Sequence, residues 1–329
     1  MADERLEAEL AVQGGTDEAF VEGAFRLVLR RDPDPEALER ALAKLEEGTL
    51  SRAALIHELA TSTEFERVQE LDDAVALGLG ARERGERIRW LQASPETDER
   101  VVEVPWVLSR LRPDGRVLEI GYAFAETAYL GALLRSGVEL VGADLATRGV
   151  NGLETVEADV RELPFPDRSF DQILLVSTLE HIGADNERYG LEGEPDEAAP
   201  LQALEELRRV LRGDGSLLVT VPLGEPGDYG WFRQDDERGW NGLYARAGFF
   251  VAEQEAYELT EDGWRAAPDF DAEGVIYGTK GPAAAAVLCA ELRPGRLRRL
   301  VTPGGLWTTA RRRARPLRHR RGSRAGPDD

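Results

Sequence analysis

The spacing of hydrophobic residues changes along the chain and predicts two kinds of structure. Residues 16–68 place apolar side chains at helical spacing, as in Phe20, Ala24 and Leu27, after a capping Thr16. From residue 115 onwards, continuous apolar runs of strand length alternate with helical segments. Strands that are apolar throughout are typical of a parallel sheet covered by helices on both faces. We therefore predict an α/β fold with a doubly wound, mostly parallel sheet, preceded by a small all-α domain.

Seven apolar runs are predicted as the strands of this Rossmann-like sheet. They cover residues 116–121, 138–144, 153–159, 170–178, 216–224, 248–259 and 283–292. Amphipathic segments at residues 126–137 and 197–215 are predicted as helices that end at glycines. Ligands of such sheets bind at the carboxyl ends of the strands, near the point where the strand order reverses. We expect the functional site at that edge.

These patterns divide the chain into four regions. Residues 1–72 are predicted to form a small helical domain suited to docking, and residues 73–112 a helical connector. Residues 113–291 contain the predicted sheet, and residues 292–329 form an arginine-rich tail that we expect to be disordered. The alternative role for the tail is peripheral contact with an anionic membrane surface or an acidic polymer.

Composition narrows the classes of function. The 329 residues carry a net charge of −21, and the basic tail leaves the rest of the chain still more acidic. Such a surface is expected to repel nucleic acid. The single cysteine, Cys289, excludes an internal disulfide, and no apolar run reaches the length of a membrane span. Because the acidic start is also unlike a secretory signal, we expect a cytoplasmic protein.

The segment VLEIGYAFAETAYL, residues 117–130, has the pattern of a strand, a tight turn and a helix, which is where nucleotide cofactors bind. A dinucleotide fingerprint needs glycine at the first, third and sixth positions of the turn. Those positions hold Gly121, Ala123 and Glu126. A carboxylate at the start of the helix would repel the pyrophosphate that this helix end should attract. The turn therefore disfavours a cofactor that carries phosphate.

A cofactor without phosphate suits the same turn better. S-adenosylmethionine carries a sulfonium and an ammonium group, so nearby carboxylates favour its binding. Glu119, Asp144 and Asp159 each end a predicted strand, where Asp144 could accept from ribose hydroxyls and Asp159 from the adenine amino group. The alternative for each acid is a cap on the following helix or turn. The neighbouring residues expected beside the cofactor are Gly121, Tyr122, Ala123, Leu145, Val160 and Ser177.

These segments resemble the class I S-adenosylmethionine-dependent methyltransferases over roughly residues 100–291. The first motif of that family, E.G.G.G, corresponds to EIGYAFA, with alanine at the second and third glycine positions. Asp144 takes the acidic position of the second motif, and EADVRELPFPDRSFD, VSTLEHIG and ALEELRRVLRGDGSLLVTVP match the later ones. The resemblance implies S-adenosylmethionine as the cofactor and methyl transfer as the reaction.

Candidate catalytic and acceptor-binding residues follow the fourth predicted strand. A hydroxyl acceptor must lose a proton, and His181 is the candidate general base, with a pocket-shaping histidine as the alternative. Asp185, Asn186 and Tyr189 lie in the polar loop that follows, and Trp231 lies in an aromatic loop suited to sugar faces. The alternative for the aromatic loop is packing within a lid or subdomain core. No metal site is predicted, because no cluster has metal-ligand spacing.

The first region resembles a helical domain of unknown function that is related to phycobilisome linker repeats. The segments FRLVLRRDPDPEAL, KLEEGTL and STEF carry this resemblance, which covers about 50 residues. Such domains accompany enzymes that build cell-surface glycans, which is an association rather than a mechanism. It favours a glycan or another small-molecule acceptor, and a protein partner for the helical domain.

We therefore expect an S-adenosylmethionine-dependent methyltransferase that acts on a small-molecule or glycan acceptor. The expected reaction is O-methylation in cell-surface polysaccharide or related biosynthesis. One alternative is an NAD-dependent sugar-modifying enzyme, against which Ala123 and Glu126 argue. Another is a non-catalytic partner protein, against which Asp144, Asp159 and His181 argue.

Overall fold

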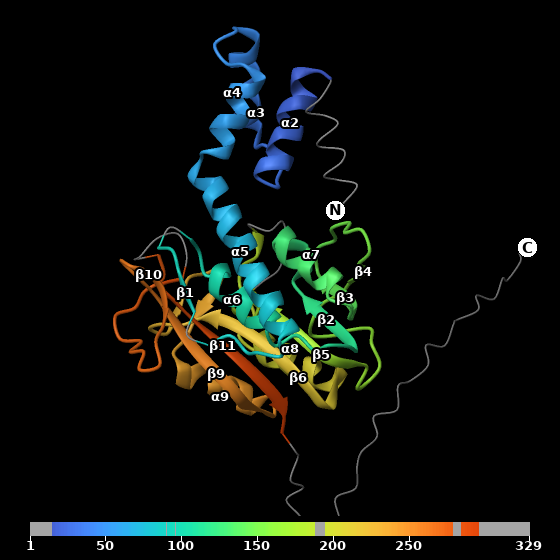
Figure 1. Ribbon diagram of the computed structural model, residues 1–329. Coiled ribbons are helices and arrows are strands. Elements are labelled where there is room, and N and C mark those ends of the chain that lie inside the picture. The colour runs from blue at the N-terminus through green and yellow to red at the C-terminus, as the bar shows by residue number, and fades with distance from the viewer. Residues whose placement is uncertain (1–14, 90, 96, 188–194, 279–283, 296–329) are drawn as a thin grey trace, which may run out of the picture. The chain divides into compact units, whose positions relative to one another are not determined.

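The computed structural model describes residues 15–89, 91–95, 97–187, 195–278 and 284–295 (Figure 1). Its main element is a nine-stranded sheet with the order β1-β10-β9-β11-β6-β5-β2-β3-β4. The bounds are β1 Gln92–Ala93, β2 Arg116–Ile120, β3 Glu139–Asp144, β4 Glu154–Glu157, β5 Phe170–Val176, β6 Leu211–Pro222, β9 Phe249–Thr260, β10 Gly263–Ala266 and β11 Ala286–Pro294. The predicted α/β fold and its seven strands are confirmed, and the short strands β10 and β1 extend one edge.

The strand order places a reversal in the middle of the sheet. Strands β2 to β6 pair in parallel, with β3 and β4 on one side of β2 and β5 and β6 on the other. Strand β11 runs antiparallel to both of its neighbours, β6 and β9. The reversal lies between β2 and β5, so the carboxyl ends of these two strands form the expected ligand-binding edge.

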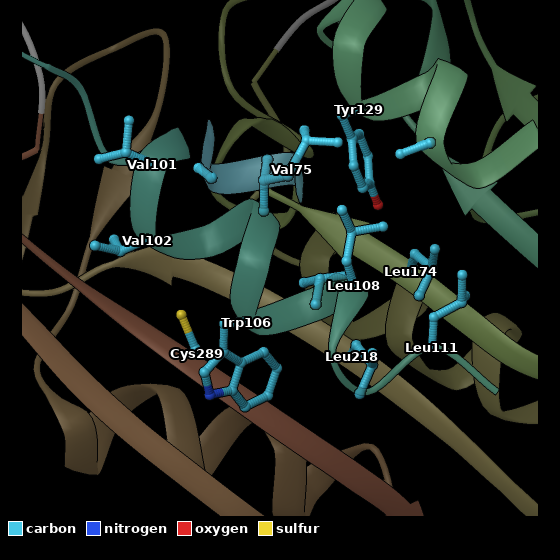
Figure 2. Close-up of a cluster of buried hydrophobic side chains, with 14 of the residues drawn as sticks. Val75, Val101, Val102, Trp106, Leu108, Leu111, Tyr129, Leu174, Leu218 and Cys289 are labelled. Atoms are coloured by element: carbon cyan, nitrogen blue, oxygen red, sulfur yellow. The ribbon is translucent and has the colours of Figure 1, made fainter. Parts of the chain in front are cut away.

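Helices cover both faces of the sheet. Apolar residues of α5 (Thr63–Glu83), α6 (Arg100–Leu108) and α7 (Thr127–Arg135) form one core with the sheet, and Figure 2 shows part of it. On the other face, α8 (Ala199–Val210) and α9 (Glu237–Arg246) pack through residues such as Leu207 and Trp240. Figure 1 shows α9 beneath the sheet and α5 to α7 above it. Within the described ranges, no helix has the length and apolar character that crossing a membrane requires.

One predicted helix end is wrong. The segment 197–215 was expected to stay helical up to its glycines, but α8 ends at Val210 and β6 begins at Leu211. Leu211 has an extended backbone, is almost fully buried and pairs with Phe170 at the start of β5. The apolar contact of Leu211 with the sheet therefore overrides the local helical pattern, and the glycines fall within the strand.

Three short helices precede α5 and have a core of their own. They are α2 (Asp17–Val28), α3 (Pro35–Glu46) and α4 (Arg52–Ala60), and buried residues such as Phe20 and Leu55 form their core. The predicted cap Thr16 is confirmed, since its side chain accepts from the backbone N–H three residues later, and Ser51 caps α4 in the same way. The proposed boundary at residue 72 falls within α5, which continues to Glu83.

A buried arginine that follows helix α6, Arg110, attaches the end of this helix to strand β9. The Arg110 guanidinium donates from Nη2 to Glu253 Oε1 at 3.0 Å and lies 3.9 Å from the ring centroid of Trp106. Its Nη1 donates to the carbonyl oxygens of Ile88 and Trp106 at 3.0 and 3.2 Å. The side chain is fully buried, so these contacts fix the end of α6 against β9.

We predict that Arg110→Met lowers the free energy of unfolding by about 1.5–3 kcal/mol, because it removes the buried guanidinium that donates to Glu253 and to the carbonyl oxygens of Ile88 and Trp106. Glu253 keeps ion pairs with Arg87 and Arg89, so its charge is not left without a partner. The matched control is Arg265→Met, which breaks an ion pair to Glu258 whose arginine side chain is 57% exposed. The control should cost about 1 kcal/mol or less. Urea denaturation of both variants measures the difference, and equal losses would contradict a structural role specific to Arg110.

Candidate active site

The turn after β2 requires glycine at one position only. Gly121 has φ 87°, and a Cβ there would lie 2.6 Å from Thr178 Oγ1, so both conformation and space exclude a side chain. Residues Tyr122–Phe124 continue as a single 3-10 turn, η1, and Ala125 has φ −69°. Positive φ values among described non-glycine residues occur at Arg30, Arg168 and Ser177, outside this turn. Alanine at the second and third motif positions is therefore compatible with the backbone.

A cavity of about 330 Å³ opens beside this turn, at the carboxyl ends of the parallel strands. Its lining includes most of the residues predicted to hold the cofactor, together with His181 and one acceptor candidate. These residues are Glu119, Gly121, Asp144, Leu145, Asp159, Val160, Ser177, His181 and Asn186. The fold thus brings together strand ends that lie up to 58 residues apart between Glu119 and Ser177.

Two of the predicted acids are hydrogen-bonded, and Glu119 is buried whereas Asp144 is half-buried. Glu119 is buried and accepts from the Tyr129 hydroxyl at 3.0 Å, and burial raises its carboxyl pKa well above the usual value. Asp144 accepts from the backbone N–H groups of Ala123 and Ala146 at 3.0 and 3.1 Å. Burial likewise raises the pKa of Asp144, although these N–H bonds oppose the shift. The capping alternative is therefore present at Asp144, and its contact with ribose hydroxyls stays a prediction.

The third acid has a different environment. Asp159 forms a bidentate ion pair with Arg161, with contacts between 2.6 and 3.0 Å. Hydrogen bonds from that guanidinium lower the pKa of the Asp159 carboxyl. Arg161 also reaches Asp196 at 3.3 Å. The sequence analysis did not predict that Arg161, two residues after Asp159, would form an ion pair with it.

The remaining predicted residues lie at or beyond the margin of the cavity. Tyr122 is fully buried, and its ring packs against Gly142, where a Cβ would come within 2.8 Å. Ala123 contributes its backbone N–H to Asp144 rather than a cavity surface. Asp185 is exposed and accepts from the Glu187 backbone N–H at 3.0 Å. Tyr189 lies outside the described residues.

His181 is oriented by the aromatic loop after β6. Its Nδ1 lies 2.9 Å from the Trp231 carbonyl oxygen, and its ring stacks on the Trp231 indole with centroids 5.1 Å apart. Because a carbonyl oxygen can only accept, Nδ1 carries a hydrogen, and the basic lone pair of a neutral ring belongs to Nε2. Glu180 Oε1 lies 3.8 Å from that Nε2, and burial raises the Glu180 pKa well above its usual value.

The aromatic loop itself is packed. Phe232 is almost fully buried and stacks on Tyr229 at 4.7 Å, and Tyr277 lies 4.5 Å from Phe232. Trp240 is buried and donates from Nε1 to the Pro222 carbonyl at 2.9 Å. These contacts favour the packing interpretation for Phe232 and Trp240, whereas Trp231 is only half-buried beside His181.

Helix α6 contributes residues to the cavity that the sequence analysis did not assign. Arg100 and Val104 line it together with Glu126, which occupies the N-cap position of α7, and with Phe124, which is 52% exposed. The connector was predicted to be helical, but nothing in its local pattern linked it to the strand ends. A sequence signal did exist: Arg100 and Glu103 are charged positions on a helix that is otherwise strongly apolar.

Glu103 holds α6 against the edge of the cavity. Its carboxylate is fully buried and accepts from Ser177 Oγ at 2.8 and 2.9 Å. Ser177 follows β5 with φ 43°, and its backbone N–H donates to Thr220 Oγ1 at 3.0 Å. Burial raises the pKa of Glu103 to about 7. The strained Ser177 backbone is thus fixed from both α6 and β6.

Comparison with known proteins adds family information for two segments. Residues 118–219 match the family model of a methyltransferase domain, and residues 7–68 match that of a domain of unknown function. An Encephalitozoon cuniculi protein with a provisional methyltransferase name is 35% identical over 74 residues, which are 22% of this chain and 30% of that protein. An uncharacterized protein of Methanocaldococcus jannaschii is 34% identical over 64 residues, 20% of this chain and 21% of that protein. The chain thus spans less than a third of the length of either relative.

Similarity to solved structures is weak. A Burkholderia thailandensis 1,6-didemethyltoxoflavin-N1-methyltransferase, crystallised with S-adenosylhomocysteine, has 16% identity and a TM-score of 0.41, with 80% of this chain and 93% of that chain covered. A SAM-dependent methyltransferase from Methanosarcina mazei has 15% identity and a TM-score of 0.38, covering 58% and 97%. At these scores, the likenesses carry no argument about the acceptor.

Glu103 gives a pH prediction with a defined sign. Its pKa is raised from 4.5 to about 7, so its stabilising contribution is complete below pH 4.5 and is lost as the pH rises through 7. Glu103→Gln mimics the protonated form and should therefore have a free energy of unfolding about 3 kcal/mol higher than that of the wild type at pH 8, because each unit of pKa shift corresponds to about 1.4 kcal/mol. At pH 4.5 the two proteins should differ little.

Urea denaturation at both pH values tests this expectation. Glu36→Gln is the matched control, because Glu36 lies on α3 with its side chain 86% exposed. A Glu103→Gln variant with the same stability change at both pH values would show that the group does not titrate as its burial requires.

Proposed function

We propose that the protein transfers methyl groups from S-adenosylmethionine to a small-molecule or glycan hydroxyl, since residues 118–219 match the family model of a methyltransferase domain. The observation that supports the proposal most directly is the cavity itself, where carboxylates from three strand ends face one space beside His181. S-adenosylmethionine is the cofactor of this domain. Its positive charges suit a site in which Glu119, Glu126 and Asp144 line the wall.

The residues present suit this cofactor better than a dinucleotide. Glu126 occupies the N-cap position of α7 and lines the cavity, so a pyrophosphate at that helix end would meet a carboxylate. Asp144 ends β3 and keeps its carboxylate beside the turn through Ala123 N–H, where it can accept from a ribose hydroxyl. These contacts argue against the NAD-dependent alternative. They also argue against a non-catalytic partner protein, because buried acids without a ligand would only lower stability.

We assign His181 the role of general base. S-adenosylmethionine supplies a methyl group on a sulfonium that leaves as a neutral thioether. As the acceptor oxygen bonds to the methyl carbon, His181 would take the hydroxyl proton at Nε2 while Nδ1–H stays on the Trp231 carbonyl. The stacked Trp231 ring and the Glu180 side chain keep the imidazole in this orientation.

The acceptor is proposed from the surroundings of His181. Asn186 donates to the His181 carbonyl at 3.0 Å, lines the cavity and has a buried Oδ1 with no hydrogen-bond partner among the described residues. This oxygen can accept from an acceptor hydroxyl, and the half-buried Trp231 ring offers an apolar face. The helical module that precedes the domain supports a glycan-related acceptor by association and would itself bind a protein partner.

We propose a cytoplasmic location, which the single cysteine, Cys289, fits. We also propose that the acceptor is not a nucleic acid, because the net charge of −21 opposes nucleic-acid binding. The expected start of the tail at residue 292 is wrong, because β11 continues to Pro294 and Leu292 is fully buried. The proposed contact with an anionic membrane or polymer concerns residues 296–329, which lie outside the described ranges.

The cofactor assignment predicts that Asp144→Asn weakens binding of S-adenosylhomocysteine at least about tenfold, since an amide replaces the charged acceptor of the ribose hydroxyls. Calorimetric titration measures the affinity. Asp167→Asn is the matched control, because Asp167 is 74% exposed and contacts Arg209 instead of the cavity. Unchanged binding by Asp144→Asn would remove Asp144 from the cofactor site.

The catalytic assignment predicts that His181→Gln lowers turnover by about 10²–10⁴-fold, because glutamine preserves a hydrogen bond but cannot take a proton. A panel of glycosides assayed for S-adenosylhomocysteine formation provides the measurement. Affinity for S-adenosylhomocysteine should stay within a few-fold of wild type. Turnover that survives this substitution would leave His181 with a pocket-shaping role.

A further inference from the structure

We propose that Arg100, at the start of α6, binds the carboxylate at the methionine end of the cofactor. The inference rests on the proposed function and adds a residue from outside the family-matched segment 118–219. Arg100 lines the same cavity as Gly121, Glu126 and Ser177. It would make the connector between the helical module and the sheet part of the cofactor site, and it would determine selectivity for an intact amino-acid group.

Strand order indicates which end of the ligand lies near α6. The strand ends that line the cavity follow the order β5, β2, β3, β4 in the sheet. If the ribose binds Asp144 on β3, the adenine lies next to residues 158–161, which follow the neighbouring strand β4 and line the cavity. The opposite direction leads to the ends of β2 and β5, where Glu119, Ser177 and Arg100 line the wall. The amino-acid end of the cofactor therefore meets α6.

The charges at that end match a zwitterion. An α-amino acid group carries one ammonium and one carboxylate, so its site needs an anion and a cation. Glu119 and Glu126 supply carboxyl groups, and Arg100 supplies a guanidinium whose planar donors fit a carboxylate. Without Arg100, the described wall at this end would offer carboxyl groups but no guanidinium or ammonium group to the ligand carboxylate.

Arg100 has guanidinium N–H groups that make no hydrogen bond to the described residues. Among the described residues, its guanidinium makes one hydrogen bond, from Nη1 to Glu99 Oε1 at 2.5 Å, and its side chain remains 33% exposed. A guanidinium has five N–H groups, so this one contact leaves others for a ligand. The second arginine lining the cavity, Arg161, is different, because Asp159 and Asp196 both occupy it at the β4 end.

A purely structural role for Arg100 makes a different prediction. The same guanidinium lies near Glu99, Glu103 and Glu126, whose negative charges raise its pKa. If Arg100 only offset those acids, its loss would disturb the whole cavity and weaken every ligand alike. If it binds the carboxylate, its loss affects only ligands that carry that group.

Two ligands separate these roles. S-adenosylhomocysteine carries the amino-acid end, whereas 5′-methylthioadenosine has the same adenine, ribose and thioether without it. Calorimetric titration of the full chain compares wild type, Arg100→Gln and Arg100→Lys, with Arg40→Gln as the control on an exposed face of α3. Thermal unfolding of each variant verifies that it is folded.

We expect Arg100→Gln to weaken S-adenosylhomocysteine about 10–100-fold while methylthioadenosine changes less than twofold, and Arg100→Lys to recover part of the loss. Equal losses for both ligands, or no loss for either, would overturn the assignment. So would a wild-type protein that gains no affinity from the amino-acid end. A wild type that binds neither ligand would instead overturn the proposed function, and the Arg100 assignment with it.

Discussion

The hydrogen bond between Ser177 and the buried Glu103 side chain is the interaction on which the architecture of the site depends. A fully buried carboxyl group costs free energy unless it is hydrogen-bonded, and the Ser177 hydroxyl directs its single hydrogen at the two Glu103 oxygens, 2.8 and 2.9 Å away. That bond joins a helix from before the sheet to the residue that ends β5, the strand next to the cofactor turn. At the other end of α6, Arg110 is bonded to β9. The helix is thus held at both ends, and Arg100 is carried to the cavity wall.

The features of this site that the sequence predicts depend on residues close together in the chain. Strands β2, β3 and β5 are continuous apolar runs, and the residues that end them are set by chain position alone. Because parallel strands place their carboxyl ends at one edge, the sequence is enough to assign Glu119, Asp144 and Ser177 to one cavity. The caps Thr16 and Ser51 are equally accessible, since a cap depends on residues three positions apart.

The features that the sequence did not reveal depend on contacts between distant segments. Arg100 and Glu103 precede the first cofactor motif, and only the packing of α6 over the sheet brings them to the strand ends. The end of α8 differs from the prediction for a similar reason. Burial of Leu211 against the start of β5 favours an extended backbone there over the helix that the local sequence predicts. Asp159 is the exception, since its partner Arg161 is close in sequence. At Asp159 the ion pair with Arg161 competes with the expected contact to adenine. The sequence pattern does not determine which of these two partners the carboxylate binds.

The altered glycine motif also has a physical interpretation. Glycine is required where φ is positive or where a side chain would collide, and Gly121 meets both conditions. Ala125 adopts φ −69°, and Ala123 uses its N–H to hold Asp144 in place. A methyl group at these positions therefore costs no backbone strain and leaves the hydrogen bond intact. The turn therefore departs from the glycine pattern of the resembling family while it keeps the Ala123 N–H bond that positions Asp144.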